Sequence, residues 1–181
     1  MDGATRSARS PGGDIQPTLT PGMANAADLW QFCLHHYAKQ EVKQACLKLQ
    51  DEHQGNVNLA LLLAWIESHG YGLSPESLTQ LKHALSRSEH LLIAYRHLRR
   101  DLKPRVGTGQ YKKMLNFELS LEKFQQQDLI EVLNRQSWLT QAASPLAYYC
   151  RQLSPSARNL YTPLRVDRPA KEDGACDDDT L

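Results

Sequence analysis

The sequence has little net charge and lacks a hydrophobic run long enough to cross a membrane. Its most apolar stretch, Val57 to Ile66, is far shorter than the roughly 20 residues that a transmembrane helix needs. The N-terminus has no apolar core of the kind found in secretory signals. A net charge of +1 gives the whole molecule no attraction to nucleic acid or to an anionic membrane. These absences predict a cytoplasmic protein that does not associate with membranes.

Motifs of catalysis and metal binding are also missing. None of the four cysteines belongs to a CxxC pair, and there is no glycine-rich phosphate loop, nucleophile elbow or HExxH sequence. His83, His90 and His97 repeat every seven residues, which places neighbours about 10.5 Å apart along a helix. That spacing is too wide for one metal ion, whose ligands lie about 2 Å from it. We therefore expect no metal and no cofactor, and we favour a non-enzymatic protein.

What the sequence does contain is helical periodicity. In the stretch from Val57 to Ile66 only Asn58 is polar, and a helix that is apolar on all sides is normally buried. We expect a central helix over about 57–68, with amphipathic helices packed around it. These flanking helices are predicted over 29–37, 41–53, 75–102 (as one or two segments) and 110–134. The fold class is therefore all-α, a single small bundle of five or six helices around a buried central helix.

The composition changes toward both ends of the chain. Residues 1–26 are rich in Gly, Pro, Ser, Thr and Ala, which predicts a disordered leader with Asp28 as the first helix cap. Residues 139–181 end in EDGACDDDTL and are predicted to be a mostly disordered, acidic tail, in which Leu146, Tyr148 and Tyr149 form the one segment able to dock. The helical domain is then expected over 27–138, with no strand and no internal repeat.

One part of the sequence resembles a known family. The pattern consists of Leu29-Trp30, Ala45-Cys46, Leu49-Gln50, Val57-Asn58-Leu59 and Trp65. It is similar to the opening of an uncharacterised proteobacterial family of small helical proteins, a domain of unknown function. The resemblance covers about 28–135 and implies a helical fold in a bacterial cytoplasm. It implies no activity.

A polar corner is predicted where the second helix ends and the central helix begins. Its members are Asp51, His53, Asn56 and Asn58. Such a corner can bind an anion or a metal at the helix N-terminus, or serve as the site of an unrecognised enzyme or small-ligand binder. In the alternative, Asn56 only caps the helix and Asn58 bonds to backbone, because a buried amide without a partner costs on the order of 1–3 kcal/mol.

A basic segment follows in the second half of the chain. Its candidate binding residues are Arg96, Arg99, Arg100, Lys103 and Arg105. Most of them share one helix face, which suits contact with phosphate or with an acidic protein surface. The alternative is a solvated face opposite Leu98 and Leu102. We also hypothesise that the acidic tail folds back onto this face and screens it.

The function that these features favour is a protein-interaction or adaptor module that binds a protein partner through the basic face. One alternative is an RNA- or nucleic-acid-associated regulatory protein. The other is an enzyme or small-ligand binder at the Asp51–Asn58 corner, which a deep polar pocket there would favour. The seam of Met114, Phe117, Leu121 and Phe124 either closes the core or pairs with another helix, including a second copy of its own. The sequence predicts no oligomeric state.

Overall fold

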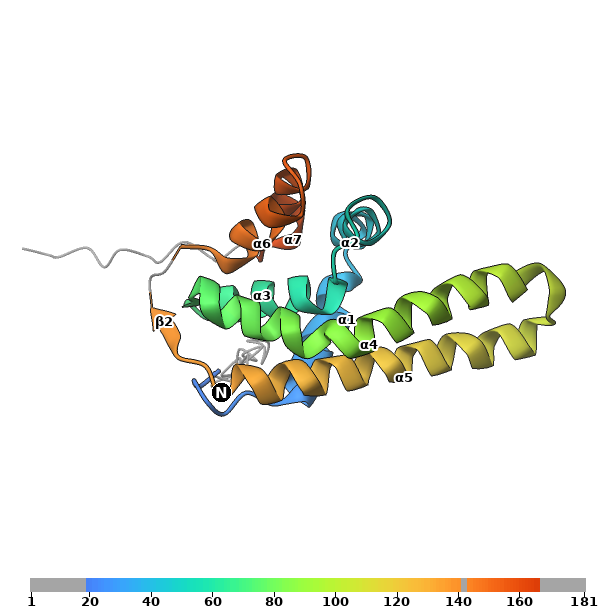
Figure 1. Cartoon of the computed structure of the whole chain (residues 1–181), viewed down its shortest axis with the longest axis horizontal. Coiled ribbons are helices and arrows are strands. Elements are labelled where there is room, and N and C mark those ends of the chain that lie inside the picture. Colours follow the sequence, from blue (N-terminus) through green and yellow to red (C-terminus); the bar gives the residue numbers. More distant parts are fainter. Residues whose placement is uncertain (1–18, 141–142, 167–181) are drawn as a thin grey trace, which may run out of the picture.

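A computed structural model describes residues 19–140 and 143–166 of the chain. The fold is all-α, as predicted, with one small two-stranded sheet (Figure 1). No helix within the described ranges is both long and apolar enough to cross a membrane. The helices are α1 (Ala26–Tyr37), α2 (Gln40–His53), α3 (Val57–Ser68), α4 (Pro75–Leu102), α5 (Thr108–Leu133), α6 (Pro145–Leu153) and α7 (Tyr161–Leu164). Two short 3-10 helices span Lys103–Arg105 and Ala157–Leu160, and the strands are β1 (Tyr71–Leu73) and β2 (Trp138–Thr140).

Helix α3 is the centre of the fold, which confirms the prediction made from its composition. All residues from Asn58 to Ile66 are buried, and the helix packs against α1, α2, α5, α6 and α7. Asn56 begins it as predicted, because its side-chain oxygen accepts a hydrogen bond from the Leu59 N–H at 2.8 Å. An apolar helix with neighbours on every side needs no solvent-facing polar stripe.

Helices α4 and α5 form a long antiparallel hairpin. Helix α4 is continuous, since Ser86 and Ser88 direct their hydroxyls to the backbone carbonyls of the preceding turn and do not break it. It begins as the sequence indicates, with Ser74 as N-cap and Pro75 in the first turn. The proximal half of the hairpin packs on the domain, and its distal half projects beyond the other helices (Figure 1).

The expected end of the helical domain at residue 138 is wrong. Residues 145–164 form α6, a 3-10 helix and α7, which lie on the side of α3 that faces away from the hairpin (Figure 1). The side chains of Leu146, Tyr149 and Leu164 are fully or almost fully buried. Short helices with few apolar residues give weak periodicity, so the segment looked disordered in sequence. The acidic end of the tail lies in 167–181, outside the described residues.

The start of the domain is also earlier than predicted. Leu19 and Ala24 are buried in the core, and Asn25, not Asp28, caps α1 by accepting a hydrogen bond from the Asp28 N–H at 2.8 Å. The rest of the predicted leader, 1–18, lies outside the described residues. The two strands were not predicted either, because three residues each are too few to show alternation. They pair antiparallel with Gly72 opposite Leu139.

Candidate functional site

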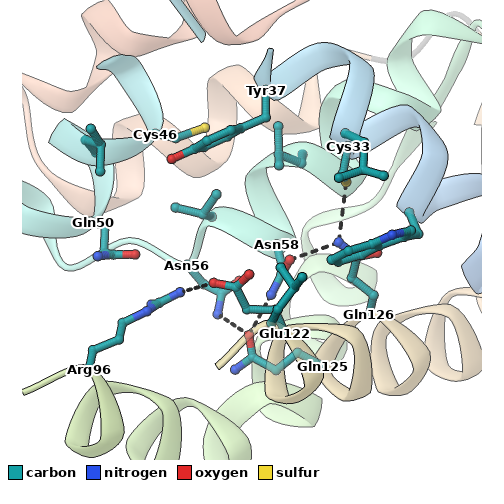
Figure 2. A pocket seen from close by; sticks show the side chains of 16 residues that line it. Cys33, Tyr37, Cys46, Gln50, Asn56, Asn58, Arg96, Glu122, Gln125 and Gln126 are labelled. Carbon is teal, nitrogen blue, oxygen red and sulfur yellow. Dashed lines mark hydrogen bonds and ion pairs between the residues drawn. The ribbon is translucent and has the colours of Figure 1, made fainter. Parts of the chain in front are cut away.

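Four amide side chains meet between the start of α3 and the middle of α5. Asn56, Asn58, Gln125 and Gln126 form this amide cluster, and none is more than 9% exposed. Asn58 donates to Gln125 Oε1 at 2.9 Å and accepts from Gln126 Nε2 at 3.0 Å (Figure 2). Asn56 donates to Gln125 Oε1 at 3.2 Å and also contacts the Glu89 carboxylate. The cluster joins α3, α4 and α5 through polar contacts inside the core.

Sequence reasoning missed half of this cluster. One of the two interpretations of the polar corner had Asn58 bond to backbone, and this is wrong, because its partners are the side chains of Gln125 and Gln126. The two glutamines, which follow the apolar seam of α5, were not among the candidate residues. The available signal was their position, since polar residues that interrupt a buried seam must find partners inside the protein.

The amide cluster forms one wall of a pocket of about 220 Å³, here called the amide pocket. Its other walls are mostly apolar and are lined by Trp30, Leu34, Tyr37, Leu61 and Leu119, among others. Gln126 Oε1 is buried and has no hydrogen-bond partner among the described residues. An unpaired buried acceptor is uncommon in native structures. The amide pocket therefore combines apolar walls with a polar wall whose hydrogen-bonding capacity is not fully used.

Two thiols also line the amide pocket. Cys33 accepts a hydrogen bond from Gln126 Nε2 at 3.4 Å, and Cys46 lies near the Tyr37 ring (Figure 2). Burial raises the pKa of both thiols to about 12. Because the thiolate is the nucleophilic form of cysteine, these groups remain protonated near neutral pH. They act as small apolar groups in the pocket wall.

Arg96 reaches across from α4 to the edge of this pocket. Its guanidinium lies 2.6 Å from Glu122 Oε1 on α5 (Figure 2). It also lies 3.1 Å from Glu118 Oε1 on the same helix. Burial raises the pKa of Glu122, and the charge of Arg96 opposes that shift. Arg99 also pairs with Glu118 and donates to the Tyr111 hydroxyl at 2.6 Å. The positive charges of both arginines are thus paired with acidic side chains of α5 inside the hairpin.

Some residues of the predicted basic face are therefore paired with α5, and others are exposed near the hairpin tip. The side chains of Arg96 and Arg99 are only 12% exposed and point toward α5. The acids that pair with them, Glu118 and Glu122, lie on α5 and are outside the basic segment recognised in the sequence. Lys103 and Arg105 are exposed near the hairpin tip, and binding of protein or nucleic acid by this tip stays a prediction.

A second pocket, of about 360 Å³, lies beside the amide pocket and is here called the charged pocket. It is lined by Asp51, Glu89, Arg96, His97 and Arg100, together with Gln50, Gln54, Gly55 and Ile93. Asp51 pairs with Arg100 at 3.1 Å. The polar corner and the basic segment, separate in sequence, thus face each other across one cavity. His53 is not part of it, because its ring contacts the Ser154 hydroxyl at 3.0 Å.

The two pockets form one candidate site. Both are lined by Gln50 and Arg96, so these two residues stand between an apolar compartment and a charged one. No group of three or more His, Cys, Asp or Glu side chains suited to a metal ion occurs within 19–140 and 143–166. The chemistry that the site offers is hydrogen bonding, charge pairing and apolar contact.

Comparison with known proteins gives one match. A family model described as "Protein of unknown function (DUF2390)" matches residues 28–129, a range that contains every residue lining the two pockets. Comparisons with curated proteins and with solved structures found no match. Helices α6 and α7 lie beyond the matched range.

Proposed function

The chain belongs to the DUF2390 family of proteins of unknown function, and we propose that it binds a small amphipathic molecule across the amide and charged pockets. The observation that carries this proposal is the pair of adjoining cavities with different linings and a shared edge at Gln50 and Arg96. The proposed ligand has an apolar body, which occupies the amide pocket, and a polar head group, which occupies the charged pocket. The charged pocket beside Asp51, next to the amide pocket that Asn56 lines, supports this function over an adaptor function.

The dimensions of the site suit a metabolite. The two cavities measure about 220 and 360 Å³, and small-molecule sites commonly occupy roughly 300–1,000 Å³ with mostly apolar walls and a few placed polar groups. The aromatic rings of Trp30 and Tyr37 line the smaller cavity. An aliphatic or single-ring body therefore fits there.

The charges of the site define the head group. Asp51 and Glu89 contribute two negative charges to the charged pocket, and Arg96 and Arg100 contribute two positive charges. Arg96 already pairs with Glu122 and Arg100 with Asp51, so a head with one net charge would add an unbalanced charge, which is costly where water is partly excluded. A zwitterionic head pairs with both signs at once. The ligand class is therefore an amino acid, or a close analogue, with an apolar side chain.

Three related probes test the head group by isothermal titration calorimetry. L-phenylalanine carries both charges, 3-phenylpropanoate carries only the carboxylate, and 2-phenylethylamine carries only the ammonium group. We expect L-phenylalanine to bind at least about tenfold more tightly than either analogue, since an unpaired charged group costs roughly 1–3 kcal/mol or more. Equal binding of all three, or binding of none, contradicts the proposal.

Two leucine variants test whether the ligand binds in the amide pocket. Leu119 lines the amide pocket and is 41% exposed, and Leu139 is also 41% exposed but lies on β2, outside both pockets. Leu119→Trp fills the cavity and should abolish binding of L-phenylalanine, whereas Leu139→Trp should leave it unchanged. Both variants are expected to fold, because each side chain already faces solvent. Binding that survives Leu119→Trp would place the ligand elsewhere.

A further inference from the structure

The hairpin carries an exposed apolar face that the candidate ligand site does not use. Leu91 and Leu98 on α4 are 62% and 52% exposed, and Phe117 and Phe124 on α5 are 53% and 61% exposed. Each pair is separated by seven residues, so its members lie on one side of their helix. The Tyr95 ring, between the two leucines, contacts the Phe117 ring at a centroid distance of 5.1 Å. The four side chains therefore form a single outer face of the hairpin.

The structure divides the predicted seam of α5 into two parts. Met114 and Leu121 are half-buried on the side of α4, whereas Phe117 and Phe124 are more than half exposed. Two exposed phenylalanines on one helix face are unusual for an isolated domain, and such patches commonly mark interaction sites. We therefore expect the outer face to bind an apolar surface of a partner.

The charges around the two phenylalanines are arranged symmetrically. Lys113 lies four residues before Phe117, and Asp128 lies four residues after Phe124. Both are exposed, and neither forms an ion pair among the described residues. When two copies of α5 run antiparallel about a two-fold axis near Ser120, Phe117 meets Phe124 of the other copy and Lys113 meets Asp128.

We propose that the outer face binds a second copy of this chain, forming a two-fold antiparallel dimer through the α4–α5 hairpins. A two-fold interface must be self-complementary, and the order Lys113, Phe117, Phe124, Asp128 meets this condition in both apolar contact and charge. The distal half of the hairpin stands clear of the other helices (Figure 1), so a second hairpin can lie alongside it. The small side chain of Ser120 near the axis allows the two helices to approach closely.

The available area is sufficient for a stable dimer. Helix α5 has 26 residues, which gives it a length of about 39 Å. Two packed helices present a face about 20 Å wide. The resulting area of roughly 800 Å² is what a standard interface buries on each partner.

Charge variants in the full chain test the pairing by sedimentation equilibrium. Lys113→Asp places two acids opposite each other at both ends of the interface, and Asp128→Lys places two lysines there. Each variant alone should self-associate at least about fourfold more weakly than the wild type, because two attractions become two repulsions of roughly 0.2–1 kcal/mol each. An equimolar mixture of the two variants should regain wild-type affinity, since both contacts then join opposite charges.

Two controls complete the experiment. Lys112→Asp makes the same charge change at a neighbouring exposed residue outside the outer face and should leave self-association unchanged. The double variant Phe117→Ser, Phe124→Ser should be monomeric while keeping the helical circular dichroism spectrum of the wild type. A wild-type chain that remains monomeric up to about 100 µM overturns the proposal and assigns the face to a foreign partner or to a terminal segment. Failure of the mixture to restore association also overturns it.

Discussion

Asn58 is the buried polar residue of the most apolar helix in the chain, and its environment explains why it is tolerated. Its amide nitrogen and oxygen each have a partner, Gln125 Oε1 at 2.9 Å and Gln126 Nε2 at 3.0 Å. A buried amide in such a network is close to neutral in free energy, whereas a half-satisfied network is strongly unfavourable. The contacts of Asn58 therefore matter more for stability than its polarity does.

We predict that Asn58→Leu lowers the free energy of unfolding by about 1–3 kcal/mol, because it removes the acceptor of Gln126 Nε2 and a donor to Gln125. Urea unfolding measures this change. Asn116→Leu is the matched control, since Asn116 is exposed on α5 and surface changes usually stay within about 0.5 kcal/mol. If the two variants are equally stable, the amide cluster does not support the fold.

For single residues, the sequence indicated roles that depend on neighbouring positions, such as helix capping. It did not indicate hydrogen-bond or ion-pair partners that lie far along the chain. The cap formed by Asn56 depends on a residue three positions away, and it was predictable from sequence. The partners of Asn58, Arg96 and Arg99 lie on α5, and pairing over such separations leaves no local pattern. Of the residues that line the candidate site, the sequence indicated Asp51, Asn56, Asn58, Arg96 and Arg100, but it did not indicate their grouping into two adjoining pockets.

Gly55 controls the junction between α2 and α3. Its N–H donates to the Leu49 carbonyl at 2.8 Å, directly after Gln54 closes α2 in the left-handed region with φ 53°. A Cβ atom at Gly55 would lie 2.7 Å from Leu153 Cδ1 and 2.8 Å from Leu49 Cγ. Glycine is therefore required here by the close approach of α6, which the sequence did not indicate.

We predict that Gly55→Ala destabilises the protein by about 1–3 kcal/mol, as overpacking of a well-filled core does. Gly109→Ala is the comparison, because a Cβ there meets nothing within 4 Å and Gly109 lies in the first turn of α5. That change should stabilise the fold by about 0.4–1 kcal/mol. Thermal unfolding of both variants shows whether each substitution raises or lowers the stability of the protein. A Gly55→Ala variant as stable as the wild type would show that α6 does not pack closely against this junction.

Helices with strong apolar periodicity were predictable as elements, and weakly periodic ones were not. The central helix was expected over 57–68, and the structure places α3 at Val57–Ser68. The last long helix was expected over 110–134, close to the observed Thr108–Leu133. Helix α7, by contrast, has only four residues, and it is held by tertiary contacts that do not appear as a pattern in the sequence.

For the molecule as a whole, α6 and α7 complete the core around α3 although they follow a segment without clear periodicity. The Tyr149 hydroxyl accepts a hydrogen bond from the Asn56 N–H at 2.7 Å, and the His36 ring contacts the Leu164 carbonyl at 2.8 Å. These contacts connect the C-terminal helices to the start of α3 and to α1. The unit that folds therefore extends beyond residue 129, where the family match ends.

Two truncated chains test this extent. A chain that ends at Thr140 loses the buried side chains of Leu146, Tyr149, Cys150, Leu160 and Leu164. The three leucines alone are worth about 1.5–3 kcal/mol each, and their sum is comparable to the roughly 5–15 kcal/mol that stabilises a typical domain. We expect this chain to lose cooperative urea unfolding followed by circular dichroism, while a chain that ends at Val166 unfolds like the full-length protein. Cooperative unfolding of the shorter chain would mean that residues 19–140 fold alone and that α6 and α7 only cover a finished core.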